Sequence, residues 1–289
     1  MQLHIKNLDK RYTNGVHAVA DLSLEIGNGM FGLLGPNGAG KSSLMRILAT
    51  LQQPDSGEVW LNDINLLKDP IAVKQQLGYL PQEFGVYPGI SAEDLLTHFA
   101  VLKGVTARGV RKELVRYLLQ KVNLYDVRKR YVASYSGGMR QRFGIAQALL
   151  GDPKLVIVDE PTAGLDPNER IRFNNLLSEI SEDIIVILST HIVDDVSDLC
   201  RDMAVMNNGR IVLRGAPSEL IKEVKGKIWG RFTSRQELET LSRQHNVLYS
   251  YLAEGKPFTR IYAQEDPGQL FEPVVPRLED LYFKSISAN

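Results

Sequence analysis

The chain is poor in cysteine, has no excess of charge of either sign and contains no long apolar run. Cys200 is the only cysteine among 289 residues, so an intramolecular disulfide is excluded and a reducing compartment is favoured. Lysine and arginine together number 34, as do aspartate and glutamate. No overall electric field therefore draws the chain to nucleic acid or to anionic lipid, although local basic patches are allowed. We expect no nucleic-acid partner.

No stretch approaches the roughly 18 apolar residues that a membrane-spanning helix requires. The most apolar stretch, residues 184–188, has the length of a strand. Residues 1–6 alternate between apolar and polar side chains and lack the apolar block of a signal peptide. We therefore expect any link between this chain and a membrane to go through a partner.

A glycine-rich loop is the feature around which the chain is organised. It has the spacing G-x-x-x-x-G-K-[ST] and consists of Gly35, Pro36, Asn37, Gly38, Ala39, Gly40, Lys41 and Ser42. A short apolar run at residues 30–34 precedes the loop. Apolar residues follow it at helical spacing, namely Leu44, Ile47, Leu48 and Leu51. Strand, glycine loop and helix thus come in the order typical of a phosphate-binding loop.

The residue types of this loop suit the binding of phosphate. Glycine lets the backbone turn its N–H groups inward with no Cβ in the way, and the dipole of the following helix adds partial positive charge. Lys41 can then reach the β- and γ-phosphates of a nucleotide, and the Ser42 hydroxyl is placed to ligate Mg²⁺.

Two carboxylates follow an apolar strand in the middle of the chain. Residues 155–158 are fully apolar and lead into Asp159 and Glu160. Carboxylates in such a place are costly unless a cation or a proton transfer uses them. Asp159 fits the strand-end aspartate that holds Mg²⁺ in phosphate-loop enzymes, and Glu160 is placed to orient and deprotonate the attacking water. A solvated strand end is the alternative interpretation.

Two further signals are weaker when each is taken by itself. Ser136, Gly137 and Gly138 open a helix and form a second anion-binding N-terminus, although an ordinary helix cap has the same residues. His191 follows the strand at residues 184–188, at the sheet edge where ligands bind, and it could donate a hydrogen bond to a γ-phosphate. A lone histidine is more often structural.

Tyr12 and Gln82 complete the set of candidate residues. Tyr12 could stack on an adenine ring, or it is a surface tyrosine in a turn. Gln82 lies at the junction between the sheet and a helical stretch, where an exposed glutamine is the default interpretation.

Alternating residues at 3–8, 22–26 and 59–62 predict an antiparallel sheet that flanks the buried strands. The composition changes near residue 215, and the pattern beyond it predicts a helix, a strand, a second helix, a strand pair and a final helix.

These patterns divide the chain into two predicted domains. The first is a nucleotide-binding domain at residues 1–217, with a helical insert at about residues 83–147. The second is a small C-terminal accessory domain at residues 218–289, which is marginal alone and is expected to pack on the main domain or on a second copy.

Taken together, these stretches resemble the nucleotide-binding subunit of an ATP-binding cassette (ABC) transporter over about residues 2–215. The motifs of that family match this sequence as follows: the adenine-stacking Tyr12, the Walker A loop Gly35 to Ser42 with Ser43 after it, the Q-loop Gln82, the signature residues Ser136, Gly137 and Gly138, the Walker B residues Asp159 and Glu160, the D-loop Ala163-Gly164-Leu165-Asp166, and the switch histidine His191. The signature loop departs from the usual Leu-Ser-Gly-Gly-Gln at Tyr135 and Met139. Methionine cannot donate a hydrogen bond as glutamine would.

The resemblance implies an α/β fold, a P-loop NTPase cassette with a mixed central sheet, an antiparallel β subdomain and a helical insert, followed by a small α+β C-terminal extension. It implies ATP and Mg²⁺ as cofactors, with Ser42, Gln82 and Asp159 as metal ligands. Glu160, His191 and Gln82 would be catalytic, while Tyr12, the Walker A loop, Ser43, the signature residues and Asp166 would bind nucleotide.

The resemblance also implies partners. Two cassettes, from two copies of this chain or from a paralogue, would stack head to tail with ATP between the Walker loop of one and residues 136–138 of the other. The dimer would hydrolyse ATP to power separately encoded transmembrane permease subunits, as a cytoplasmic protein peripheral on the inner face of the cell membrane. A solitary cassette with a short C-terminal piece resembles the subunits of exporters.

Three other functions compete with this hypothesis. A soluble ABC ATPase that acts on ribosomes or nucleic acid usually carries two cassettes, coiled arms or basic extensions, which this sequence lacks. A small-molecule kinase would use the phosphate loop without the signature residues. A regulatory protein that binds nucleotide without hydrolysis is disfavoured because Glu160 is present.

Overall fold

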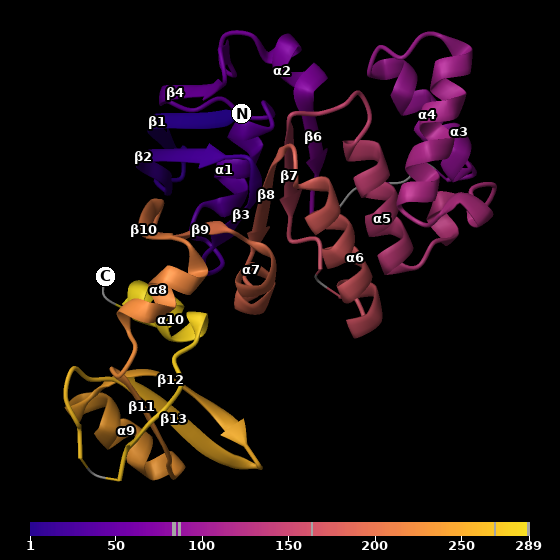
Figure 1. Ribbon diagram of the computed structural model, residues 1–289. Coiled ribbons are helices and arrows are strands. Elements are labelled where there is room, and N and C mark those ends of the chain that lie inside the picture. The colour runs from indigo at the N-terminus through magenta and orange to yellow at the C-terminus, as the bar shows by residue number, and fades with distance from the viewer. Residues whose placement is uncertain (83–84, 86–87, 163, 269, 288–289) are drawn as a thin grey trace.

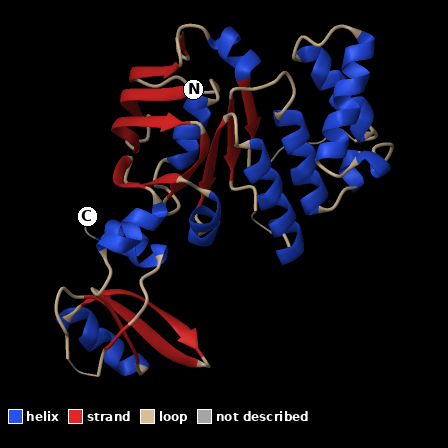
Figure 2. Ribbon diagram, viewed as in Figure 1, coloured by secondary structure: helices blue, strands red, loops and turns tan. Residues whose placement is uncertain are grey.

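The computed structural model describes residues 1–82, 85, 88–162, 164–268 and 270–287. Figure 1 shows a main body built on a central sheet, a group of helices at its right, an antiparallel sheet at its upper left and a smaller lobe below. Figure 2 shows that the lobe consists of strands with a helix on one side.

The antiparallel sheet has the strand order β2-β1-β4-β5. Its strands are β1 (Gln2–Arg11), β2 (His17–Gly27), β4 (Ser56–Leu61) and β5 (Ile64–Asn65). Alternate residues of β1, such as Leu3 and Ile5, are buried, as the sequence pattern predicts. The predicted antiparallel subdomain is therefore confirmed.

The central sheet has the order β10-β9-β3-β8-β7-β6. Its strands are β3 (Gly29–Leu34), β6 (Leu77–Leu80), β7 (Leu155–Asp159), β8 (Ile185–Thr190), β9 (Asp202–Asn207) and β10 (Arg210–Gly215). All neighbours pair in parallel except β9 and β10, which form a hairpin. The sheet is mixed, as expected, and the carboxyl ends of β3, β7 and β8 meet at one edge.

Both faces of this sheet are buried, which explains why its strands are continuously apolar. Val156 and Val158 of β7 belong to one apolar core, and Leu155 and Ile157 belong to the other. The first core holds the helical insert, and the second holds the antiparallel sheet and α1 (Lys41–Leu48). The helical insert and α1 therefore lie on opposite faces of the central sheet.

The helical insert contains α3 (Ala92–Leu102), α4 (Arg108–Lys121) and α5 (Gly137–Ala148), joined by short 3₁₀ turns at Tyr125–Val127 and Val132–Ser134. The predicted start of the insert near residue 83 lies outside the described residues. Further helices of the main body are α2 (Pro70–Gln76), α6 (Pro167–Ile180) and α7 (Val193–Leu199).

Four details of the sequence interpretation need correction or addition. Leu51 does not continue the buried stripe of α1, because the helix ends at Leu48 and Leu51 is 61% exposed. The sequence patterns also missed α2, α7 and the edge strand β6, since seven or fewer residues give too short a window for periodicity to be read.

The C-terminal lobe is a sheet with the order β12-β13-β11-β14. Its elements are β11 (Ile228–Phe232), α9 (Arg235–Gln244), β12 (Asn246–Ala253), β13 (Lys256–Tyr262) and β14 (Glu272–Pro273). Two helices, α8 (Pro217–Glu223) and α10 (Leu278–Ser287), lie between the lobe and the main body (Figure 1). Leu220 and Leu281 on these helices share a core with the main body, so the lobe is tied to the cassette by apolar packing.

A buried ion pair joins the lobe to α10. Arg260 donates from Nε to Oδ1 and from Nη2 to Oδ2 of Asp280, both at 2.7 Å, and the side chains are 3% and 0% exposed. Arg260 Nη2 also donates to the Val275 carbonyl at 2.7 Å, and the Arg277 N–H donates to Asp280 at 2.7 Å. Asp280 thus accepts hydrogen bonds on both carboxylate oxygens.

Replacement of Asp280 by alanine would leave the Arg260 guanidinium buried without its counter-ion. We expect this change to lower the free energy of unfolding of the lobe by about 3–5 kcal/mol. Trp229 on β11 reports on the lobe in a Trp60→Phe background, because the chain has only two tryptophans. Urea unfolding followed by Trp229 fluorescence measures the loss, and a loss below about 1 kcal/mol would contradict the role given to this pair.

Candidate nucleotide-binding site

The glycine loop joins β3 to α1 in the conformation that a phosphate loop needs. Gly38 and Gly40 have φ values of +82° and +106°, which are unfavourable for residues with a Cβ. At Gly40 a Cβ would also clash with the Ala18 carbonyl. No side chain among the described residues caps the start of α1, so the N–H groups of its first turn are left for a ligand.

Lys41 is held across this loop. Its Nζ donates to the carbonyl oxygens of Gly35 at 2.7 Å and Pro36 at 3.2 Å, and the residue is 6% exposed. Burial lowers the pKa of Lys41, while the negative charges of Glu160 and Asp159 act in the opposite direction. Within the described part of the chain, the hydrogen-bond acceptors of this ammonium group are neutral carbonyl oxygens, so a phosphate would be a stronger partner.

A cavity of about 480 Å³ opens beside the loop. Most of the predicted site residues line it, together with Val16 and Ala18: Tyr12, Pro36, Asn37, Gly38, Ala39, Gly40, Lys41, Ser42, Ser43, Gln82, Glu160 and His191. The structure therefore brings together residues that are up to 179 positions apart in the sequence.

Tyr12 lines this cavity, and the hydrogen bonds of its hydroxyl group orient the ring. The hydroxyl lies 3.0 Å from Ser43 Oγ and donates to Gln52 Oε1 at 3.0 Å. The hydrogen bond with Ser43 is the main cause that lowers the pKa of Tyr12, and burial opposes it. Gln52 was not expected from the sequence, and it acts here only by holding the tyrosine.

Glu160 lies at the centre of the three expected catalytic residues. Gln82 Nε2 donates to Glu160 Oε2 at 3.0 Å, and His191 Nδ1 lies 3.3 Å from Glu160 Oε1. The backbone N–H of Glu160 donates to the Ser189 carbonyl at 2.8 Å. Its φ of +48° is in the left-handed region, which costs a residue with a side chain on the order of 1 kcal/mol or more. Such strain is typical of functional positions.

Asp159 offers a buried carboxylate oxygen that lacks a partner. The residue is 5% exposed, and its buried Oδ1 has no hydrogen-bond partner among the described residues. Burial raises the pKa of the Asp159 carboxyl, the neighbouring Ser189 hydroxyl opposes this rise, and the charge of Glu160 adds to it. A cation would relieve both penalties, so the residue fits the predicted metal ligand.

The described residues contain no group of three or more His, Cys, Asp or Glu side chains that could hold a metal ion by themselves. Mg²⁺ commonly binds through one or two protein ligands, water and substrate phosphates. Asp159 and Ser42 are compatible with such a site only when phosphate oxygens complete it.

The signature residues lie elsewhere on the surface. Ser136 caps α5, where its Oγ accepts a hydrogen bond from the Met139 N–H at 3.2 Å, and both Ser136 and Gly137 are exposed. Neither residue lines the cavity of its own chain. Gly138 is buried against Glu169 of α6, whose side chain leaves no space for a Cβ.

Asp166 likewise does not line the cavity. It caps α6 and accepts a hydrogen bond from the Glu169 N–H at 3.0 Å. Ala163, the first residue of the predicted D-loop, lies outside the described residues.

Known proteins similar to this chain identify its family. A family model for ABC transporters matches residues 19–163. The chain belongs to this family. Its relatives include the uncharacterized ABC transporter ATP-binding protein YxlF of Bacillus subtilis (strain 168), which is 32% identical over 99% of this chain and 100% of that protein. The probable multidrug ABC transporter ATP-binding protein YbhF of Escherichia coli (strain K12) is 36% identical over 77% of this chain and 39% of that protein.

Solved structures confirm the predicted P-loop NTPase fold. A structure described as the ATP-binding subunit of an ABC transporter has a TM-score of 0.68 and 26% identity, and covers 77% of this chain and 93% of that chain. A dimeric post-hydrolysis state of the ATP-binding cassette MJ0796, bound to ADP and Pi, has a TM-score of 0.67 at 24% identity over 74% of this chain and 98% of that chain, and shows the same fold.

The chain is thus an ABC transporter ATPase subunit. Relatives named for the import of methionine and of phosphonates are also similar to it, so the family alone leaves the direction of transport open.

The buried charge of Asp159 gives a test by pH. Because burial raises the folded-state pKa, the ionised carboxylate destabilises the nucleotide-free fold above that pKa, and this penalty disappears as the pH falls through it. We expect Asp159→Asn to raise the free energy of unfolding near neutral pH and to lose that advantage toward about pH 4. Urea titrations at the two pH values measure the difference, and a variant that is less stable at neutral pH would contradict the assignment.

Proposed function

We propose that two copies of this chain, or this chain and a paralogue, bind two ATP molecules between them and hydrolyse ATP to drive export through separately encoded membrane subunits. The observation that carries this proposal is the separation of Ser136 and Gly137 from the cavity of their own chain, combined with their exposure. A helix N-terminus binds phosphate, and this one lies away from the phosphate loop of its own chain, so we propose that its phosphate is held by another chain.

In this proposal, the loop amides and Lys41 hold the phosphates, and Tyr12 stacks on adenine. Glu160 accepts a proton from the attacking water, Gln82 orients Glu160, and His191 donates to the γ-phosphate. The 3.0 Å and 3.3 Å contacts of Glu160 with Gln82 and His191 support these roles. Mg²⁺, held by Ser42, Asp159 and Gln82, would neutralise charge that develops on the phosphates.

The dimer closes in this scheme because only the closed form uses both phosphate-binding surfaces. ATP then has a higher affinity for the closed form than for separate chains, so its binding shifts the population toward closure. Loss of the γ-phosphate removes one contact and shifts the population back. The dimeric form of the MJ0796 cassette supports the proposed assembly.

Glu160→Gln tests the proposed function. The amide keeps the hydrogen-bonding shape but cannot accept the proton, so we expect hydrolysis to fall on the order of 10²–10⁴-fold while ATP still binds. Because the nucleotide persists, the variant is expected to elute as a dimer in gel filtration with ATP and Mg²⁺. A variant that stays monomeric, or hydrolyses ATP at the wild-type rate, would refute the assignment. Lys41→Ala serves as the control that loses ATP binding.

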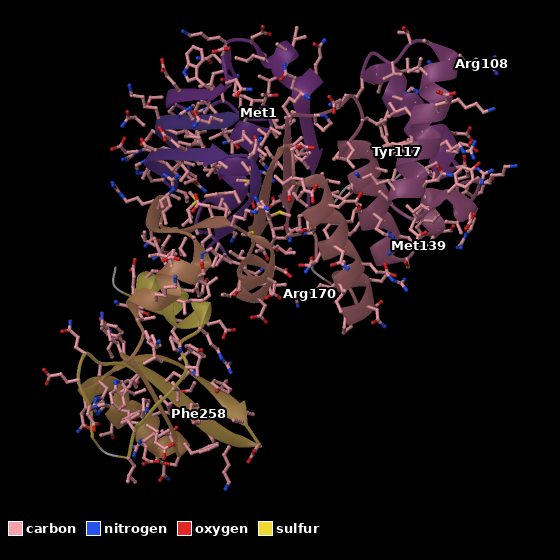
Figure 3. All side chains as sticks on the ribbon, in the orientation of Figure 1. Met1, Arg108, Tyr117, Met139, Arg170 and Phe258 are labelled. Carbon is pink, nitrogen blue, oxygen red and sulfur yellow. The ribbon has the colours of Figure 1, made fainter. Side chains whose placement is uncertain are left out.

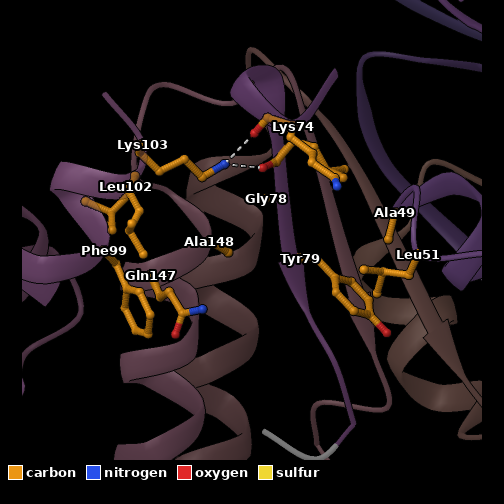
Figure 4. Close-up of a pocket in the computed structure, with 12 residues that line it drawn as sticks. Ala49, Leu51, Lys74, Gly78, Tyr79, Phe99, Leu102, Lys103, Gln147 and Ala148 are labelled. Atoms are coloured by element: carbon orange, nitrogen blue, oxygen red, sulfur yellow. Dashed lines mark hydrogen bonds between the residues drawn. The ribbon is translucent and has the colours of Figure 1, made fainter. Parts of the chain in front are cut away.

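We also propose where the membrane subunits bind. A groove of about 380 Å³ lies between the helical insert and β6. Figure 4 shows Phe99 and Leu102 of α3 on one side and Leu51 and Tyr79 on the other. The Lys103 side chain lies at one end of the groove, where its Nζ donates to the carbonyl oxygens of Lys74 and Leu77, both at 2.7 Å. β6 leads from this groove directly to Gln82.

A short apolar helix of a permease subunit is the proposed occupant. Leu51 and Leu102 are 61% and 69% exposed at the groove, and such leucines favour an apolar partner surface. None of the described helices is long and apolar enough to cross a bilayer itself. Movement of Gln82 with bound nucleotide would then reach the permease through β6.

The charge of the helical insert supports a position at the inner face of the membrane. Residues 103–142 contain 11 lysines and arginines and only two acidic residues, although the whole chain is neutral. Arg108, Lys112 and Arg116 form an exposed row on α4, and Figure 3 marks Arg108 at the outer end of this helix. Basic surfaces of this kind are attracted to anionic headgroups.

One relative is named for multidrug transport, and in the proposed scheme the membrane subunits set the direction of transport. Their identification after co-purification with the tagged chain from detergent-solubilised membranes decides between export and import. A permease named for uptake would refute the proposed direction.

Leu102→Asp tests the groove. Because Leu102 is 69% exposed, the change leaves the fold intact and places a charge against the proposed apolar helix. We expect at least a tenfold loss of co-purified membrane subunit, on the order expected for a buried unpaired charge. Leu252→Asp is the matched control, since Leu252 is also 69% exposed but lies on β12. Equal recovery of the membrane subunit with both variants would exclude this groove.

A further inference from the structure

Asp195 on α7 is a buried carboxylate whose hydrogen bonds join separate parts of the site. Its side chain is fully buried, and Thr162 Oγ1 donates to Oδ2 at 2.7 Å. Arg170 Nε donates to Oδ1 at 2.8 Å, Arg170 Nη2 lies 2.8 Å from the same oxygen, and Asn174 Nδ2 donates to it at 3.3 Å. Both carboxylate oxygens are therefore satisfied by side chains alone.

The partners of Asp195 come from the segments that carry the proposed site residues. Thr162 lies two residues after Glu160. Arg170 and Asn174 belong to α6, which begins directly after Asp166. Asp195 itself lies on the helix that follows His191. Figure 3 marks Arg170 where α6 faces α7.

We propose that Asp195 is a positioning residue for ATP hydrolysis, which fixes the segments that carry Glu160 and His191 relative to each other without contacting nucleotide. This inference rests on the proposed function. Asp195 is not among the residues that line the cavity. It holds the chain just beyond Glu160 through Thr162, and it holds the chain just beyond His191 through its own backbone.

The catalytic pair depends on these anchors because its own contact is weak. His191 Nδ1 and Glu160 Oε1 are 3.3 Å apart, and the His191 side chain is 49% exposed. The main chain must therefore determine where the two side chains meet. A displacement of about 1 Å in a reacting group can reduce the rate on the order of 100-fold.

Asp280 provides a matched control for Asp195. Both side chains are fully buried, and each aspartate forms an ion pair with one arginine at 2.7 to 2.8 Å. Asp280 joins α10 to β13, and it is not among the residues that line the nucleotide cavity. Asp195→Asn and Asp280→Asn thus remove the same buried charge in two different places.

The experiment compares the full-length wild type with both variants. We expect Asp195→Asn to lower kcat on the order of 10–100-fold, with ATP affinity changed less than about threefold. Asp280→Asn is expected to keep the wild-type kcat even if its melting temperature falls as far as that of Asp195→Asn. A kcat for Asp195→Asn within about threefold of wild type, or an equal loss in both variants, would overturn the proposal.

Two further measurements separate positioning from general stability. Thr162→Val removes one anchor without changing charge or volume greatly, and we expect it to lower kcat by a smaller factor than Asp195→Asn. It also decides the question if Asp195→Asn does not fold, because an unchanged kcat for Thr162→Val would then overturn the proposal.

In a Glu160→Gln background, Asp195→Asn is expected to add little further loss, since its effect acts through Glu160. Fully multiplicative losses would overturn the proposal. A wild-type chain that binds ATP but does not hydrolyse it would instead refute the proposed function itself, and with it any role of Asp195 in hydrolysis.

Discussion

The parallel pairing of β7 with β8 is the constraint on which the site depends. The pairing runs from Leu155 with Ile185 to Asp159 with Ser189, and the N–H of Glu160 continues it with a hydrogen bond to the Ser189 carbonyl. Because the two strands end at the same level, Glu160 and His191 emerge side by side. The pairing of β8 with β3 then sets both beside the phosphate loop. One layer of backbone hydrogen bonds thus fixes the distances on which catalysis would depend.

The sequence predicted those parts of the site that lie within one continuous stretch. The loop from Gly35 to Ser42 and the strand that ends at Asp159 are local patterns, because glycine conformation and strand burial are determined within a few residues. Asp195 was missed, although it lies four positions after His191. Its role depends on Thr162 and Arg170 from other segments, and the seven-residue α7 is too short for a periodic signal.

The assignment of Ser136 and Gly137 shows a different limit. The sequence identifies them as a helix N-terminus, and the fold places them on the surface away from the cavity of the same chain. Gly138 and Glu169 connect this helix end to the start of α6, which is in turn joined to α7 through Asp195. The surface proposed to contact the second nucleotide is therefore part of the same packed unit as Glu160, which would let closure and hydrolysis influence each other.

The central claim is that nucleotide is held between two chains, and a cross-link between chains tests it most directly. Asn14 and Ser134 are exposed, the first near Tyr12 and the second just before Ser136, whereas the native Cys200 is buried. Chains that carry Asn14→Cys and Ser134→Cys separately, both with Glu160→Gln, would be mixed and treated with a short thiol cross-linker. The account predicts a product between the two different chains that forms with ATP and Mg²⁺ and is largely absent without them. A yield that ATP does not change would contradict it.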